Sequence, residues 1–511
     1  MDEIAHVQSR DGMLKHAARI EEATAQAGRE EGGEASASGS RGVGSKKSKK
    51  KSYSHEHFKV YKRRWFGLAQ LVLLNVVVSW DWLTFAPVST SAALYFDVSE
   101  TAINWLSTGF LFAFVVACPF VVYLLHRGPK DSIIAASVLL LLGNWIRYAG
   151  TRANGGIFSV VMFGQILTGL AQPFVLAAPT RYSDMWFTER GRIGATALAS
   201  LANPFGGALA QLINPSLGSL PTTILIISLI TTVSTLPSFF LPSHPPTPPS
   251  ASSSLSKTPL LASLGHIARS SPFYLVFATF STYVGLFNAF SSLLNQILYP
   301  YGFSEDEAGI CGALLIVVGL LAAAIASPLL DRSHAYLLGI KLLCPVVALA
   351  YLALVWAPQT RGVVAPYVLS AVLGASSFSL LPVALEYLVE ITFPASPEVS
   401  STVCWAGGQL FGGVFIVVMN ALKDGRDVDL GAVRTVGRNA GGGGDDRPPG
   451  NMFRALVFQA VVALVVLPLP LMLGVRRLGL RHGEGRLKVD VHGDGVGEEE
   501  GVQTTEDGHE R

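Results

Sequence analysis

Long apolar stretches recur along this chain at the length that crosses a lipid bilayer, and they limit its possible folds more than any other feature. A helix needs about 20 predominantly apolar residues to span the hydrocarbon core. Only 14% of the 511 residues are charged, against about 25% in a soluble globular domain. The sequence therefore predicts an all-α membrane protein with about twelve transmembrane helices. The stretches cover residues 65–88, 102–125, 132–150, 156–179, 193–213, 221–241, 273–298, 307–330, 335–356, 363–389, 398–422 and 452–475.

A Pro/Ser-rich segment, PSHPPTPPSASSSLSK at residues 242–257, divides the apolar stretches into two groups of six. This composition is typical of a linker, because prolines and serines build no buried face. We therefore expect two six-helix halves flanked by polar tails. The expected parts are a disordered cytoplasmic tail at 1–60, a first half at 61–241, a cytoplasmic linker at 242–272, a second half at 273–475 and a disordered cytoplasmic tail at 476–511.

Lysine and arginine residues indicate which loops face the cytoplasm. They precede the first stretch and follow the second, fourth and twelfth, whereas the short loops after stretches one, five and seven have none. The positive-inside rule then places both termini in the cytoplasm. The arginine-containing loop at 423–451 is a mild exception, since this topology places it outside. We expect a multi-pass protein of the plasma membrane or of a vacuolar or lysosomal membrane.

Charge and motif content exclude several other classes of protein. A net charge of +2 is too small to indicate nucleic-acid binding. The segment GSRGVGSKKS lacks the spacing of a phosphate-binding loop, so nothing supports ATP-driven transport. No helix face gathers a nucleophile and a base, so we expect no enzyme, no cofactor and no metal site. The cysteines lie in apolar runs and are expected to be packed thiols: Cys118, Cys311, Cys344 and Cys404.

Short motifs repeat between the two halves at a nearly constant spacing. LLHRG at 124–128 recurs as LLDRS at 329–333, a shift of 205 residues. NPFGGALA at 203–210 recurs as QLFGGVFI at 409–416, a shift of 206 residues. Parallel repeats of this kind occur in membrane carriers whose substrate lies between the halves, near the bilayer midplane. We therefore expect a central site between the halves.

The first apolar stretch places the acid Asp81 between Trp80 and Trp82. A charged side chain inside a membrane is costly and usually has a function. On a continuous helix Trp82 shares a face with Phe85, Asp81 lies beside that face, and Trp80 points largely away. Since an indole ring attracts ammonium groups, these residues predict binding of a small organic cation. Asp81 could instead carry a proton or pair with a buried arginine such as Arg147.

The repeat adds further residues to the predicted site. A shift of 206 residues relates Trp82 to Asn288 and Asp81 to Phe287. Gln172 and Gln409 are amides within apolar runs. Each of these side chains could line a cleft or instead pack between helices. The predicted substrate-binding residues are Asp81, Trp82, Gln172, Phe287, Asn288 and Gln409.

Charged residues near the cytoplasmic ends predict a gate. Glu386 and Glu390 are four residues apart and share a helix face. Arg181 and Arg192 stand close to Asp184, the repeat partner of Glu390, so ion pairs between the halves could close this side. Ordinary solvation at the membrane surface is the alternative. The predicted gate and conformational residues are Arg127, Arg181, Asp184, Arg192, Asp331, Arg332, Glu386 and Glu390.

Several longer motifs carry a family resemblance over about residues 60–425. They include GNWIRY, GQILTGLAQPFVLAAPTRYSDMWF, SSLLNQ and LPVALEYLVEITFPASPEVSS. These resemble solute carrier family 49, the feline leukaemia virus subgroup C receptor-related proteins, within the major facilitator superfamily. The resemblance implies a major facilitator fold of about twelve transmembrane helices in two pseudo-symmetric six-helix halves. Members carry choline and ethanolamine, and others have been linked to haem or pyridoxine.

The resemblance also implies roles for particular residues. Choline-carrying members use a tryptophan matching Trp82, glutamines matching Gln172 and Gln409, and an aromatic pair matching Phe287 and Asn288. The chain departs from this pattern in having an asparagine for the second aromatic residue. It also has an acid, Asp81, in place of an uncharged amide. In the loop after the second stretch, Leu125 or His126 replaces the superfamily's aspartate, which Asp331 retains in the second half.

Three functional hypotheses follow. The first is a secondary-active or facilitative carrier of a small organic metabolite, amine-bearing and similar to choline, ethanolamine or pyridoxine, that works by alternating access. The second is a proton-coupled exporter of diverse organic compounds or haem, with Asp81 as the proton site. The third is a non-transporting receptor or sensor. The expected partners are the lipid bilayer and a small molecule, with or without protons, and the expected state is a monomer that binds no nucleic acid.

Overall fold

The structure is a computed structural model that describes residues 61–187, 189–247, 260–333, 336–392, 397–426, 428 and 450–474. These residues form helices joined by short turns, and their extended pairing is confined to one β-bridge between Asp424 and Asn451. The predicted tails at 1–60 and 476–511 lie outside the described residues.

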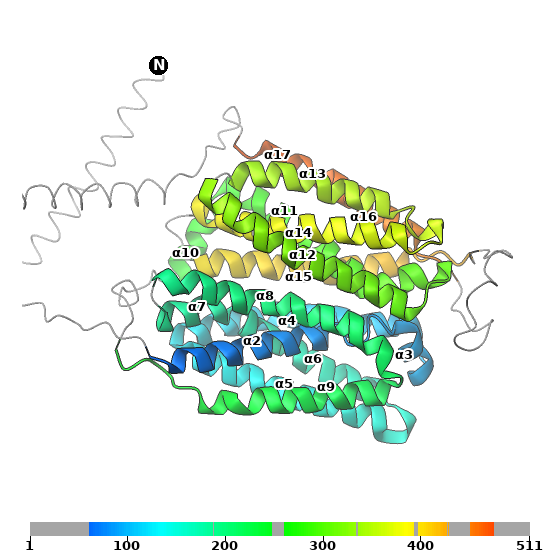
Figure 1. Ribbon diagram of the computed structural model, residues 1–511, viewed down its shortest axis with the longest axis horizontal. Coiled ribbons are helices and arrows are strands. Elements are labelled where there is room, and N and C mark those ends of the chain that lie inside the picture. Colours follow the sequence, from blue (N-terminus) through cyan, green and yellow to red (C-terminus); the bar gives the residue numbers. More distant parts are fainter. Residues whose placement is uncertain are drawn as a thin grey trace, which may run out of the picture. The chain divides into compact units, whose positions relative to one another are not determined.

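The helices fall into two groups that follow each other along the chain (Figure 1). The first half contains α2 (Arg63–Trp82), α3 (Ser89–Phe96), α4 (Glu100–Arg127), α5 (Pro129–Arg152), α6 (Phe158–Leu176), α7 (Ala178–Trp186), α8 (Glu189–Ile213) and α9 (Leu220–Thr235). The second half contains α10 (Leu260–Ile267), α11 (Ser271–Leu298), α12 (Glu305–Ser333), α13 (Tyr336–Leu354), α14 (Val364–Thr392), α15 (Pro397–Ala421), α16 (Phe453–Val466) and α17 (Pro468–Met472).

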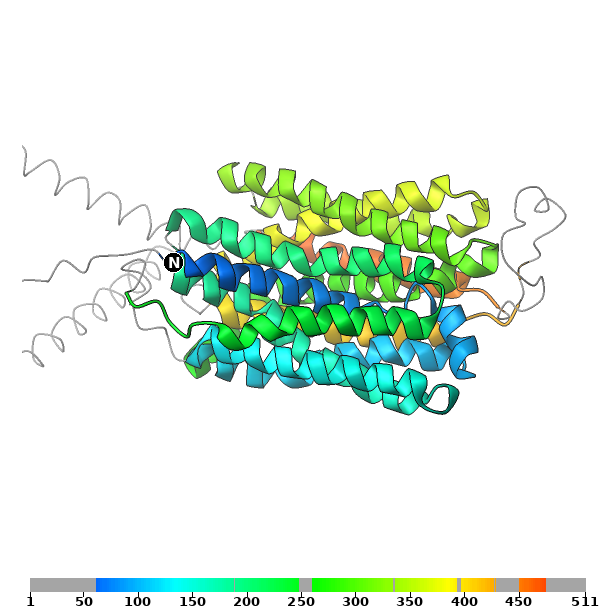
Figure 2. The same ribbon diagram turned by 60° about the horizontal axis from the view of Figure 1, so that its bottom comes forward.

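The long helices run side by side along one direction in both Figures 1 and 2. In Figure 1 the first half lies below the second, with α7 and α10 at one end of the bundle and α3 at the other. We call these the α7 end and the α3 end. Helix α10 lies within the predicted linker at 242–272 and packs against α15, so part of that segment is ordered on the bundle.

Eleven candidate membrane spans occur in the part of the chain that the structure describes, judged by length and composition. Ten of the predicted stretches each overlap one of these helices, and the twelfth is formed by α16 and α17 together. The predicted stretch at 193–213 forms α8, which has 25 residues but is not among the eleven. Its polar side chains, Asn203 and Gln211, explain the lower apolarity, and both are buried inside the protein.

Packing inside the two halves follows one scheme. In the first half α2 packs on α8, α4 on α6, and α5 on both α6 and α9. In the second half α11 packs on α15, α12 on α14, and α13 on both α14 and α16. The contacts between the halves, α4 with α15 and α8 with α12, exchange under the same correspondence. This pattern confirms two pseudo-symmetric halves built as parallel repeats.

The first apolar stretch does not form one helix to residue 88. Helix α2 ends at Trp82, residues 83–88 turn, and α3 begins at Ser89. Pro87 has no amide proton and disfavours the helical conformation in the residue before it. The expectation that Phe85 continues the helical face of Trp82 is therefore wrong, since Phe85 packs in a separate apolar cluster with Val88.

Candidate substrate site between the halves

The polar groups at the end of α2 form hydrogen bonds with side chains of the same half. Trp80 donates its indole N–H to Asn214 Oδ1 over 2.9 Å, and Asn214 Nδ2 donates to the Thr84 carbonyl over 3.0 Å. Thr84 Oγ1 donates back to the Trp80 carbonyl over 3.0 Å. A helix end inside a membrane needs such partners, because lipid supplies none.

Asp81 pairs with a buried arginine. Its Oδ1 lies 2.9 Å from Arg147 Nη1, and its Oδ2 accepts a hydrogen bond from Asn144 Nδ2 over 2.7 Å. Both charged side chains are 0% exposed. Of the alternatives that the sequence leaves open for Asp81, pairing with Arg147 is the one that forms in the structure. Among the described residues, only these two are both charged and buried.

Trp82 and Gln172 contribute unpaired polar atoms from the first half. Trp82 is 7% exposed and Gln172 is 3% exposed. Neither Trp82 Nε1 nor Gln172 Oε1 has a hydrogen-bond partner among the described residues. An unpaired buried polar group costs about 1–3 kcal/mol, so a bound molecule or a water that reached these atoms would stabilise them.

Helix α11 presents a polar face to the first half. Its residues Asn288, Ser291, Ser292 and Asn295 are buried, and their spacing of three and four residues places them on one side. Ser291 Oγ, Ser292 Oγ and Asn295 Oδ1 lack a partner among the described residues. The motif SSLLNQ contains Ser291, Ser292 and Asn295, so their spacing was visible in the sequence, but sequence reasoning named only Asn288 as a site residue.

The predicted site residues of the second half contact two different helices. Asn288 Nδ2 donates to Gln409 Oε1 over 3.2 Å, so α11 and α15 hold these amides together. Gly412 on α15 allows this approach, because a Cβ there would lie only 2.9 Å from Asn288 Cβ. Phe287 packs edge-on against Phe378 of α14, with ring centroids 5.2 Å apart.

Helix α8 connects the two groups of site residues. A Cβ at Gly207 would touch Ser79 of α2 and Leu83, the residue after Trp82. One turn further along α8, Gln211 Nε2 donates to the Ser291 carbonyl of α11 over 3.0 Å. The α2 end and the polar face of α11 therefore contact the same face of α8.

The predicted gate is described only in part. Arg127 stacks its guanidinium over the Tyr123 ring at 4.8 Å, at the end of α4. Arg181 is half-buried on α7, and Glu386 is exposed on α14. The side chains of the other gate residues lie outside the described set: Asp184, Arg192, Asp331, Arg332 and Glu390. An ion-pair gate at the α7 end stays a prediction.

The α3 end holds contacts between the halves that sequence reasoning missed. Asn104 and Gln296 exchange two hydrogen bonds of 3.1 and 2.7 Å. Lys423 Nζ lies 2.6 Å from Glu100 Oε2, and Ser91 Oγ donates to Glu305 Oε2 over 2.8 Å. We call these three pairs the α3-end latch: Asn104–Gln296, Glu100–Lys423 and Ser91–Glu305. The partners stand about two to three hundred residues apart, so no local spacing could reveal them.

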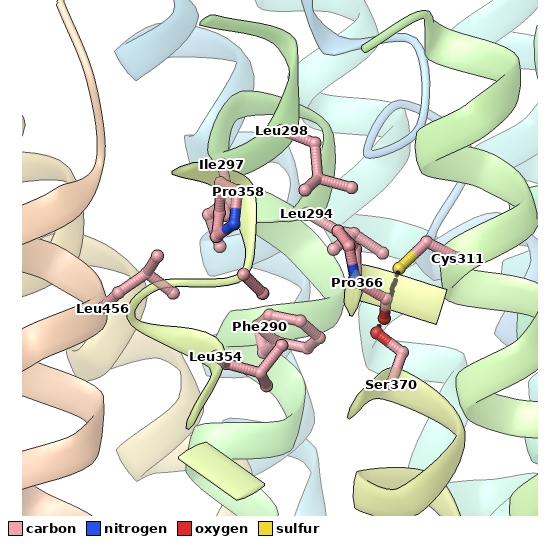
Figure 3. Close-up of a pocket in the computed structure, with 11 residues that line it drawn as sticks. Phe290, Leu294, Ile297, Leu298, Cys311, Leu354, Pro358, Pro366, Ser370 and Leu456 are labelled. Carbon is pink, nitrogen blue, oxygen red and sulfur yellow. Dashed lines mark hydrogen bonds between the residues drawn. The ribbon is translucent and has the colours of Figure 1, made fainter. Parts of the chain in front are cut away.

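A small pocket lies inside the second half, where α11 lines it with Leu294, Ile297 and Leu298 (Figure 3). Its wall includes Phe290, Leu294 and Leu354. Its polar groups come mainly from Cys311, whose thiol lies 3.0 Å from Ser370 Oγ. This apolar space is separate from the unpaired polar atoms between the halves.

Two repeated bundles of membrane-spanning helices, with buried polar side chains at the boundary between them, define a carrier of the major facilitator type. The family model of the Major Facilitator Superfamily matches residues 71–416. A bacterial homologue of the human lysosomal transporter Spinster, solved inward-facing and unoccupied, shares the fold with a TM-score of 0.60 at 15% identity. That likeness covers 81% of this chain and 97% of the bacterial one.

Curated relatives narrow the family. The chain is 34% identical to Solute carrier family 49 member A3 of Danio rerio, over 71% of this chain and 80% of the relative. It is 26% identical to the Choline/ethanolamine transporter FLVCR2 of Homo sapiens, over 72% of this chain and 73% of the relative. The chain therefore belongs to solute carrier family 49 of the major facilitator superfamily and is a multi-pass membrane transporter. This membership favours a carrier over a non-transporting receptor.

Proposed function

We propose that the protein carries a small amine-bearing metabolite, similar to choline, ethanolamine or pyridoxine, by alternating access between the two halves. The observation that carries the proposal is Trp82, a buried indole at the broken end of α2 whose N–H has no partner among the described residues. Its ring can attract an ammonium group. The Gln172 Oε1 can accept a hydrogen bond from a substrate hydroxyl, and the serine hydroxyls of α11 can either accept or donate one.

The charge at this boundary limits the substrate. The Asp81 carboxylate is already paired with Arg147, so the buried charges of the described residues sum to zero. A cation there would rely on the indole face and on amide dipoles rather than on a free carboxylate. An ammonium over an indole gains about 0.5–2 kcal/mol, which suits a weakly hydrated quaternary amine best. Relatives of this chain include choline/ethanolamine transporters.

Uptake into proteoliposomes by the purified protein tests this function. Radiolabelled choline, ethanolamine and pyridoxine are offered to the wild type, Trp82→Phe and Trp82→Ala, with Trp356→Phe as the matched control because Trp356 is 54% exposed. We expect saturable uptake of at least one amine, a KM raised about 2–30-fold in Trp82→Ala, and a smaller change in Trp82→Phe. Absence of uptake for every compound, or full activity of Trp82→Ala, contradicts the proposal.

A further inference from the structure

We infer that Arg147 and Asn144 position Trp82 through Asp81, and that Asp81 supports the substrate site without binding the substrate's charge. The inference rests on the proposed function, in which the Trp82 ring contacts an amine. It gives Asp81 a role different from that of a counter-ion or a proton carrier.

Asp81 is held from two sides. Both of its carboxylate oxygens are engaged by α5, one by Arg147 at 2.9 Å and the other by Asn144 at 2.7 Å. Its backbone carbonyl accepts a hydrogen bond from Gln165 Nε2 of α6 over 3.0 Å. That carbonyl belongs to the peptide bond that joins Asp81 to Trp82. The main chain of Trp82 is therefore tied to two neighbouring helices.

Trp82 needs this support because it is the last residue of α2. One further α-helical hydrogen bond follows it, from the Leu83 N–H to the Ser79 carbonyl over 3.3 Å, and residues 83–88 then form a turn. Its indole N–H has no partner among the described residues, whereas that of Trp80 is bonded to Asn214. The position of the Trp82 ring is thus set by packing and by its main chain, and a functional side chain depends on such supporting contacts.

The surroundings argue against Asp81 as a free counter-ion. Among the described residues, Arg147 is the one charged side chain buried beside Asp81, because no other described acidic or basic residue is buried. The Arg147 guanidinium also lies over the Phe85 ring at 5.3 Å, which fixes its place. A substrate cation at Asp81 would have to displace an arginine that is 0% exposed. Losing either charge leaves the other buried without an opposite charge.

Three variants separate the roles: Arg147→Gln, Asp81→Asn and the double variant Asp81→Asn/Arg147→Gln. The positioning role predicts that each single variant lowers transport by up to about 100-fold. The double variant should return to within about tenfold of the wild type, since two amides can bond each other and no buried charge remains. Arg147→Lys should keep more transport activity than Arg147→Gln, because a lysine can still donate a hydrogen bond to Asp81. Arg152→Gln is the matched control, since Arg152 is an exposed arginine on the same helix.

A second readout does not need transport. The fluorescence of Trp82 is obtained in each background as the difference between a protein with Trp82 and its Trp82→Phe counterpart, and its quenching by acrylamide is measured. We expect quenching to rise at least about twofold in the single variants and to return to the wild-type value in the double variant, in keeping with a supporting role. If Arg147→Gln does not give a monodisperse protein, Asn144→Ala replaces it, because that change removes the hydrogen bonds of Asn144 to Asp81, Arg147 and the Leu140 carbonyl and leaves the ion pair.

The outcomes are distinct. If Asp81→Asn and the double variant lose amine affinity equally while Arg147→Gln keeps it, Asp81 is a counter-ion and the inference is overturned. If the double variant keeps exchange but loses accumulation driven by a pH gradient, Asp81 is a proton site, which also overturns it. Unchanged Trp82 quenching in every variant overturns it as well. Failure of the wild type to transport any amine contradicts the proposed function, while the quenching series still decides the positioning role.

Discussion

The α3-end latch predicts how strongly one pair of amides keeps that end of the bundle closed. Asn104 and Gln296 are 6% and 2% exposed and exchange two hydrogen bonds between the halves. Asn104 also donates to Asn420 of α15 over 3.0 Å. The perturbation is Asn104→Leu, which keeps the size of the side chain and removes its donor and acceptor.

The size of the effect follows from the polar group that the substitution leaves without hydrogen bonds. In the closed bundle Gln296 keeps its burial and loses both of its hydrogen bonds to Asn104, which costs about 1–3 kcal/mol. When the halves separate, water can satisfy Gln296, so the cost applies to the closed form alone. An energy difference of that size shifts the ratio of open to closed protein by about 5–150-fold. Replacing both partners, in Asn104→Leu/Gln296→Met, removes the stranded group and should restore most of the closure.

The assay is the rate at which a reporter thiol is labelled. Ser292→Cys lies one turn deeper than Gln296 on α11 and is 3% exposed, so a membrane-impermeant maleimide reaches it only when the halves part. The four native cysteines are buried, and the protein without the reporter gives the background. We expect labelling about 5–150-fold faster in Asn104→Leu and near the starting rate in the double variant. Equal rates in all three proteins would refute the role of the latch.

Three further predictions concern packing and charge. Gly206→Leu should lower the free energy of unfolding by about 1–3 kcal/mol, because the Cβ of the new side chain would overlap the Val76 carbonyl of α2. Thermal unfolding measures this change. Gly265→Leu is the control, because a Cβ at that position meets open space. Asn214→Leu should lower the free energy of unfolding by about 1–3 kcal/mol, because it leaves the buried Trp80 Nε1 without its hydrogen-bond acceptor. Thermal unfolding measures this change as well. Glu100→Gln should speed reporter labelling and reduce its dependence on salt, since the pair with Lys423 is partly exposed.

The architecture could be predicted from the sequence because the signal for a membrane span lies in one continuous run of apolar residues. Apolar length predicts the spans, and the repeated motifs predict the two halves. The end of α2 at Trp82 was missed although Pro87 marks it, because the apolar run continues through residue 88 and outweighed that signal. A broken helix is allowed here because Asn214 supplies the hydrogen bonds that lipid cannot.

The candidate site could be predicted only in part, because its contacts join distant residues. The sequence marks Asp81 as unusual and includes Arg147 among its alternatives, but a separation of 66 residues cannot choose between a partner and a substrate. The repeat places Asn288 on the helix that corresponds to α2, and the contact of Asn288 with Gln409 needs the fold. The substrate roles of these residues stay predictions that transport measurements must decide.

The two halves support the site in different ways, and this asymmetry bears on the transport cycle. The hydrogen bonds that hold the α2 end run to α5, α6 and Asn214, all within the first half. Those of the α11 polar face include Gln211 and Ser89, which belong to the other half. Separation of the halves would therefore leave Trp82 in place and break the bonds of α11 to Gln211 and Ser89. A substrate that hydrogen-bonds to α11 would replace lost partners on that helix, so we expect binding to lower the cost of opening more than it changes the α2 end.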